Sequence, residues 1–159
     1  MVAHRTVTRD ISFASSLKPE HHLQLESLLF FNRRQDLVRP GILDAIDRYG
    51  APEIYSTPSG VKVRVAGPTE AQCLFAVEHH GAATRPVGLI LYTRDSFERI
   101  TVMHLVVAEE YAAGGPFADR HLLLRLVQAV RRVARRTSGI RHVELVYSQS
   151  RLKSEAVFA

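Results

Sequence analysis

Residues 100–147 read ITVMHLVVAEEYAAGGPFADRHLLLRLVQAVRRVARRTSGIRHVELVY, and this stretch decides the fold. Residues 100–108 are apolar at odd and even positions alike, which is typical of a strand buried on both faces of a sheet. A turn with paired glycines follows, then a helical period over 117–137, then a second strand over 141–147. A strand–helix–strand unit of this length predicts two parallel strands joined by a right-handed crossover.

The turn before the helix is the first candidate binding site. Gly114, Gly115 and Pro116 allow an unusual backbone path that leads directly into a helix N-terminus. Backbone N–H groups at such a place bind anionic groups. The turn therefore predicts an anion site.

The helix carries arginines on its polar face, opposite an apolar stripe: Arg131, Arg132, Arg135 and Arg136. A solvated face is the favoured interpretation, because no aromatic side chains interleave the arginines for stacking on bases. The formal net charge of +5 favours anionic small molecules or nucleic acid, but only weakly. We therefore do not expect a nucleic-acid partner.

Length and composition indicate one globular domain over residues 1–159, with 46% hydrophobic and 23% charged residues. No apolar run approaches the ~18 residues of a membrane span, and the N-terminus lacks the apolar core of a secretion signal. Cys73 is the single cysteine, which excludes an intrachain disulfide and fits a reducing compartment. We expect a cytoplasmic protein that does not bind a membrane.

The first sixty residues predict one strand and two helices. The strand covers residues 6–13, and the first helix covers 19–38. Pro40 ends that helix and starts a second one over 42–49, which Gly50 closes. A connecting loop is predicted over 51–60 because of its prolines and glycine.

Strands in close succession follow, at residues 61–65, 72–78, 87–93 and 100–108. Their connectors have hairpin length, which predicts an antiparallel meander. The fold class is therefore α+β (mixed α/β): a mixed sheet, with an antiparallel meander followed by a βαβ unit and helices on both faces. A binding crevice is expected where neighbouring strands diverge beside a helix N-terminus.

This order, with LVVAEEY at residues 105–111 leading into a glycine turn and a helix, resembles the GNAT superfamily of acyl-CoA N-acyltransferases. The resemblance implies that the backbone of Leu105, Val106 and Val107 holds the acyl and pantetheine groups of an acyl-CoA, with acetyl-CoA as the expected co-substrate. It also implies that the CoA pyrophosphate binds the turn and the helix start, at Gly114, Gly115, Phe117 and Arg120. The acyl group would pass directly to a small-molecule or peptide amine, without a metal.

Two departures from the family pattern keep a non-catalytic GNAT-fold module for ligand sensing or association as an alternative. Ala112 and Ala113 stand where the family has a basic residue and a glycine, and Pro116 supplies no N–H. Residues 154–159 resemble only the start of the helix that follows the fifth strand in the family. The closing hairpin and the usual tyrosine acid are therefore predicted to be missing.

Two side chains are candidates for catalysis. His104 is the titratable residue of the predicted central strand and could take the amine proton, although a hydrogen-bonded structural histidine is the alternative. Glu109, followed by Glu110, could lie at the mouth of the site or be an exposed turn carboxylate. Tyr147 could face the site, and a core tyrosine with a bonded hydroxyl is the alternative.

Other candidate groups indicate structure rather than chemistry. Glu78, His79 and His80 suggest a metal cluster, but adjacent histidines on a strand point to opposite faces, so we expect no metal. Cys73, in an apolar strand, is predicted to be a core residue.

The strand at residues 141–147 would lack a covering neighbour if the closing hairpin is missing. Val143, Leu145 and Tyr147 lie on one face, so the edge is apolar. An open apolar edge is a template for another chain. We therefore predict a homodimer with two-fold symmetry.

Overall fold

The computed structural model describes residues 9–30, 38–147 and 154–156. Its strands are β1 Arg9–Ala14, β2 Pro52–Thr57, β3 Gly60–Val65, β4 Gln72–His80, β5 Ala83–Arg94, β6 Arg99–Val107, β7 His142–Leu145 and β8 Ser154–Ala156. Its α-helices are α1 His22–Phe30, α2 Arg39–Tyr49 and α3 Leu122–Arg136, and its short 3₁₀-helices are η1 Pro19–His21, η3 Glu109–Tyr111 and η4 Ala118–Arg120.

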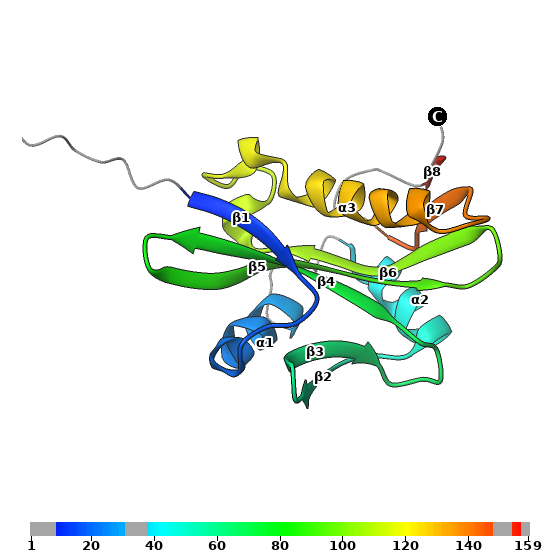
Figure 1. The fold of residues 1–159 in the computed structure, drawn as a ribbon, viewed down its shortest axis with the longest axis horizontal. Helices are drawn as coiled ribbons and strands as arrows, with labels where there is room; N and C mark the ends of the chain where they lie inside the picture. The colour runs from blue at the N-terminus through cyan, green and yellow to red at the C-terminus, as the bar shows by residue number, and fades with distance from the viewer. Residues whose placement is uncertain (1–8, 31–37, 148–153, 157–159) are drawn as a thin grey trace, which may run out of the picture.

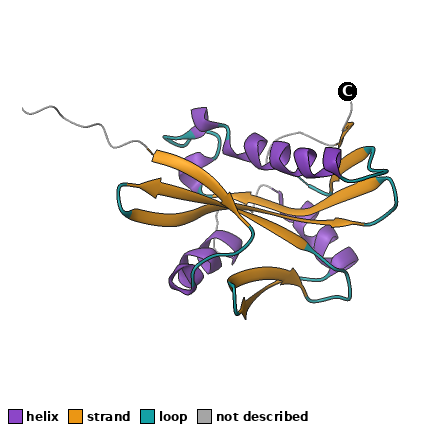
Figure 2. Cartoon of the chain, viewed as in Figure 1, coloured by secondary structure: helices purple, strands orange, loops and turns teal. Residues whose placement is uncertain are grey.

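A mixed sheet organises the fold, with strand order β1-β4-β5-β6-β7-β8 (Figures 1 and 2). β1, β4, β5 and β6 pair antiparallel, and β6 pairs parallel with β7. The α+β class and the change from antiparallel to parallel at β6 are thus as predicted. The helical connection between β6 and β7 is α3, as the period of the sequence indicated.

Helices cover both faces of the sheet, α3 on one face and α1 and α2 on the other (Figure 1). On the α3 face, Leu126 and Val130 pack against residues of β5 and β6 such as Ile90 and Leu105. On the opposite face, Leu25 and Leu28 of α1 pack with strand residues that include Leu89, Met103 and Val106. Both faces of β6 are therefore buried, which explains its continuous apolar run.

The two N-terminal helices lie where they were predicted, with different bounds in the described part of the chain. α1 ends at Phe30 in the part of the chain that is described, and residues 31–37 of the predicted first helix lie outside that part. α2 begins at Arg39, so Pro40 stands in its first turn, where its missing N–H costs nothing. Gly50 ends it as predicted: its N–H donates to the Ile46 carbonyl at 2.8 Å, and its φ of 99° favours glycine.

The prediction of a loop over residues 51–60 is wrong. Pro52–Thr57 forms β2, which pairs antiparallel with β3 in a separate hairpin (Figure 1). Pro52 is tolerated because it is the first residue of a strand with one partner. β3 is a strand as predicted, but it does not join the meander; β1 pairs with β4 in its place.

α3 begins at Leu122, five residues later than the predicted start at Phe117. Residues between them form η4, and His121 then takes a left-handed conformation with φ of 52°. A left-handed residue cannot continue a helix, so the regular helical period begins after it.

The prediction that no segment of this chain covers β7 is wrong. β8 pairs antiparallel with β7, with His142, Val143 and Glu144 opposite Ala156, Glu155 and Ser154. The predicted helical start at 154–159 is also wrong where it is described, because residues 154–156 form this strand. The homodimer was predicted because the edge of β7 would be open, and β8 covers that edge. The dimer stays a prediction, which the molar mass from light scattering coupled to size exclusion tests.

Among the described residues, no helix is both long and apolar enough to cross a membrane.

Candidate functional site

β6 and β7 separate halfway along β6. Their parallel pairing ends at Val102 and Leu145, whereas β6 continues to Val107. Beyond this point the side chain of Tyr147 links the two segments, because its hydroxyl lies 2.9 Å from His104 Nδ1. Ligands of sheets with parallel strands bind where neighbouring strands diverge at their carboxyl ends. Residues 104–107 of the predicted site lie on β6 beyond the last pair with β7.

His104 is neutral at this divergence. It is 3% exposed, and burial lowers the pKa of its imidazole to about 4. Nδ1 is paired with Tyr147, while the buried Nε2 has no hydrogen-bond partner in the described structure. A neutral imidazole can accept a proton, but one with so low a pKa is a weak base at neutral pH.

Tyr147 is fixed by its surroundings. Burial raises the pKa of its phenol, and a hydrogen bond from the Leu105 backbone opposes that shift. Its ring meets the His104 ring edge-on, with 5.7 Å between centroids. A Cβ at Gly41 of α2 would lie 2.3 Å from Tyr147 Cβ, so glycine is needed there. Tyr147 is packed and its hydroxyl is bonded, as the core alternative predicted, and its facing a binding site stays a prediction.

The glycine turn uses its own N–H groups. The Gly115 N–H donates to the Ala112 carbonyl at 2.9 Å, and the Phe117 N–H donates to the Glu110 carbonyl at 2.8 Å. Pro116 has no N–H to offer. The predicted contacts of these amides with a CoA pyrophosphate stay a prediction, and they require the turn to change conformation.

The residues after the glycines are also held within the chain. The Phe117 ring packs against the Tyr111 ring, with 5.2 Å between centroids, and the Arg9 guanidinium lies 4.8 Å from the Phe117 centroid. Arg120 Nη1 donates to the Arg9 carbonyl at 3.1 Å. The turn is thus connected to β1 at the sheet edge.

We expect Gly115→Ala to destabilise the turn. A Cβ there would lie 2.5 Å from the carbonyl oxygens of Glu109 and Glu110, a distance that backbone atoms cannot accommodate without moving. Overpacking of this kind costs about 1–3 kcal/mol of unfolding free energy, which urea titration measures. Ala113→Ser, at an exposed position of the same turn, is the matched control and should change stability by less than about 0.5 kcal/mol. Equal stability of both variants and the wild type would contradict the packed turn.

A cavity of about 430 Å³ lies at the carboxyl end of β6, on the α1 side of the sheet. Its walls come from α1, from the start of β5 and from the segment after β6: Gln24, Ser27, Leu28, Arg85, Pro86, Ala108, Glu109 and Glu110. Glu109, predicted to lie at the mouth of the site, is thus a wall residue of this cavity. His104 precedes Ala108 by four residues, about 13 Å along an extended strand, and is not among the wall residues.

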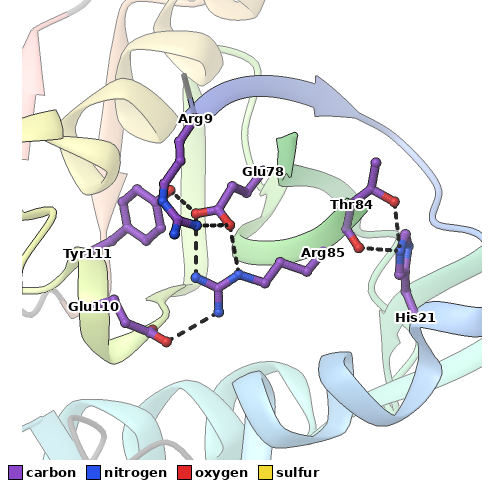
Figure 3. Close-up of polar contacts among 7 residues, drawn as sticks. All are labelled: Arg9, His21, Glu78, Thr84, Arg85, Glu110 and Tyr111. Atoms are coloured by element: carbon purple, nitrogen blue, oxygen red, sulfur yellow. Dashed lines mark hydrogen bonds and ion pairs between the residues drawn. The ribbon is translucent and has the colours of Figure 1, made fainter. Parts of the chain in front are cut away.

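An ion-pair cluster borders the cavity (Figure 3). Glu78 of β4 is buried, and its carboxylate accepts hydrogen bonds from Arg9 Nη1 at 3.0 Å, from Arg85 Nε at 2.9 Å and from the Tyr111 hydroxyl. Arg85 also reaches Glu110, with Nη1 3.2 Å from Oε1. Three parts of the chain that are far apart in sequence, β1, the β4–β5 hairpin and η3, therefore meet at one buried carboxylate.

The charge of Glu78 is stabilised by these partners. Burial alone would raise the pKa of its carboxyl, but hydrogen bonds from Arg85 and Tyr111 and the charges of Arg85 and Arg9 outweigh burial and lower it. The same contacts raise the pKa of Arg85, chiefly through its bond to Glu78. Glu78 is thus ionised at neutral pH and orients Arg85.

The sequence suggests for Glu78 only a doubtful metal cluster and does not indicate this role. Glu78 and Arg85 face each other in the register of the β4–β5 hairpin, a signal that a correct pairing of the two strands would have provided. The contribution of Arg9 has no such local signal, because it depends on β1 lying beside β4. His79 is bonded to Ser12 of β1, with its Nε2 2.7 Å from the hydroxyl.

No family model matches the chain, and no curated protein matches its sequence.

Proposed function

We propose that the protein is an acyl-CoA-dependent N-acyltransferase of GNAT type, acting in the cytoplasm on a small amine. The observation that carries the proposal is the cavity at the carboxyl end of β6, the strand from which β7 diverges nearer its middle. The antiparallel strands followed by a parallel pair across α3 agree with that architecture. The anionic wall residues Glu109 and Glu110 suit an ammonium group as the acceptor.

The acyl donor would reach the end of β6 from the α3 side. The first N–H groups of α3, from Leu122 on, have no intrahelical acceptors, and His121 provides no side-chain cap. Arg120 and Arg125 flank this helix start with positive charge. A diphosphate would bind there, in place of the engaged amides of the glycine turn. The backbone of residues 105–107 would then hold the thioester end of the donor beside the cavity, within reach of the acceptor amine.

The chemistry would be direct transfer. The ammonium loses a first proton, for which the carboxylate of Glu109 is the candidate acceptor because it lines the cavity. The neutral nitrogen attacks the thioester carbonyl carbon, and the C–S bond breaks. The second proton of the nitrogen ends on the CoA sulfur, so the products are an amide and the CoA thiol. His104 would act through Tyr147 as a positioning residue.

Calorimetric titration with acetyl-CoA tests the proposal, together with a thiol-release assay over a panel of amines. We expect binding that weakens as salt rises, because phosphate contacts are partly screened. Thiol release should depend on the amine. Absence of acetyl-CoA binding at millimolar ligand would remove the donor from the proposal.

Arg120→Gln should weaken acetyl-CoA binding about tenfold, because a charge-assisted contact to phosphate is lost. Arg64→Gln is the matched control: Arg64 lies on the β2–β3 hairpin, where it pairs with Glu53 at 3.3 Å. The control should bind acetyl-CoA as the wild type does. Equal weakening in both variants would point to net charge rather than to a site at α3.

A non-catalytic ligand-binding module is the second candidate. The engaged N–H groups of Gly115 and Phe117 and the low pKa of His104 favour it. Acetyl-CoA binding without thiol release for any amine in the panel would select this candidate.

A further inference from the structure

We infer that the cavity beside Arg85 is a binding site for a free α-amino acid, with the ligand carboxylate on Arg85 and the ligand ammonium on Glu110 and Glu109. This inference deepens the proposed function, because it names the class of amine. Only the acyl transfer to the amino acid rests on the proposed function. The amino-acid binding site is inferred from the geometry of the cavity alone.

The guanidinium group of Arg85 is held by Glu78 along one edge and has its other edge toward the cavity. Its Nε and Nη2 face the buried Glu78 at 2.9 and 3.4 Å, which holds the guanidinium plane in place. Its Nη1 points the other way, to Glu110 (Figure 3). A guanidinium held on one edge is a preorganised donor for a carboxylate on the other.

The two acidic partners of Arg85 differ in how easily they can be exchanged. The Glu78 side chain is 3% exposed, whereas the Glu110 side chain is 42% exposed. An exposed ion pair contributes little to stability, so a ligand carboxylate can replace Glu110 at Nη1 at small cost. Glu78 keeps its bonds throughout, so Arg85 stays oriented.

The charges at the cavity match those of an amino acid. The positive group of Arg85 and the negative group of Glu110 are 3.2 Å apart, and Glu109 adds a second carboxylate to the same wall. A free α-amino acid carries an ammonium and a carboxylate on one carbon, so both ligand charges find an opposite charge here. A polyamine or a peptide N-terminus has no carboxylate on that carbon and would leave Arg85 without a ligand partner.

The remaining wall residues provide room for a side chain. A volume of about 430 Å³ lies within the range of small-molecule sites. Leu28, Pro86 and Ala108 offer apolar contacts, and Gln24 and Ser27 of α1 offer polar ones. Amino acids with a medium-sized side chain, apolar or carboxamide, are therefore the best fit.

Calorimetry on the full chain without acyl-CoA tests the inference, with L-leucine and L-glutamine and the carboxamide of each as probes. We expect the amino acids to bind and the carboxamides to bind at least about tenfold more weakly, because the amide loses the charged bond to Arg85. Equal affinity for acid and amide would overturn the inference. So would absence of binding for all probes at about 10 mM, where even weak small-ligand binding is measurable.

Two variants locate the site. Ser27→Phe fills the cavity from an exposed helix position and should weaken leucine binding at least about tenfold, while leaving acetyl-CoA binding as it is. Glu110→Gln should reduce the preference for leucine over 4-methylpentanoate, which lacks the ammonium, by a similar factor. The control Glu26→Gln, a carboxylate of α1 that pairs with His22 instead, should keep the wild-type preference. An unchanged preference in Glu110→Gln would overturn the assignment of the ammonium.

Parallel titrations with acetyl-CoA separate the two proposals. Acetyl-CoA binding without amino-acid binding would overturn the inference and leave the proposed function standing. Amino-acid binding without acetyl-CoA binding would support the inference and remove the acyl transfer.

Discussion

Replacing Glu78 with glutamine is expected to lower the free energy of unfolding by about 3 kcal/mol at pH 7, as removal of one partner from a buried ion pair does. Glutamine keeps the shape of the side chain but removes the charge that Arg9 and Arg85 share. Both guanidiniums are about one third exposed, so water replaces part of what they lose, which places the effect at the low end of the range for buried pairs. Urea titration measures it.

The matched control is Glu53→Gln, in an exposed ion pair with Arg64. Its side chain is 48% exposed, so the loss should be below about 0.5 kcal/mol. Equal losses in the two variants would show that burial does not strengthen the Glu78 cluster.

The difference between wild type and Glu78→Gln should depend on pH in a defined direction. The folded-state pKa of Glu78 is lowered, so its contribution is present above the unfolded pKa of about 4.3 and is lost as pH falls through the folded value. The difference in stability between the two proteins should therefore shrink as pH falls below about 4. A difference that stays constant down to pH 3 would contradict an ionised Glu78.

The sequence was most informative for elements whose apolar pattern follows directly from which of their faces are buried. β6 is apolar at odd and even positions because both of its faces are buried. α3 has an apolar stripe because one of its faces packs on the sheet. The parallel pairing of β6 and β7 follows from the helical connection between them. These elements could be predicted from residues 100–147 alone.

The misplaced elements depend on which partners a strand finds. Residues 61–65 have a clear strand pattern, but the pattern does not say whether their neighbour is β4 or β2. Pro52 and Pro58 suggested a loop, although Pro52 stands at a strand start where its missing N–H is harmless. β8 has only three residues, too few for a period of two to be recognised.

The residues of the candidate site also differ in whether they could be predicted from the sequence. Glu109 could be selected from sequence because it directly follows a buried strand, and it does line the cavity. Arg85 and Glu78 could not be linked to it, because their meeting requires the β4–β5 register and the path of the turn to Tyr111. Long-range side-chain contacts of this kind leave no local pattern.

Unfolding free energy should also fall as pH is lowered from 6.5 toward 4, and His104 is the expected cause. Its folded-state pKa of about 4 lies below the ordinary value of 6.5, because burial disfavours the imidazolium. Protons therefore bind the unfolded state more readily in this window, and stability is lost as pH falls through it. The full difference in pKa corresponds to about 3 kcal/mol.

His104→Gln isolates this contribution, because glutamine does not titrate and can still bond to the Tyr147 hydroxyl that now meets Nδ1. The variant's absolute stability does not matter for the test, since only the slope of stability against pH between 6.5 and 4.5 is compared. Both proteins contain Glu78, so the effect of its titration on the slope cancels in the comparison. His142→Gln, which removes an exposed histidine of β7, should keep the wild-type slope. If His104→Gln keeps that slope as well, His104 is not the buried neutral group that this site requires, and its role as positioning residue for Tyr147 has to be abandoned.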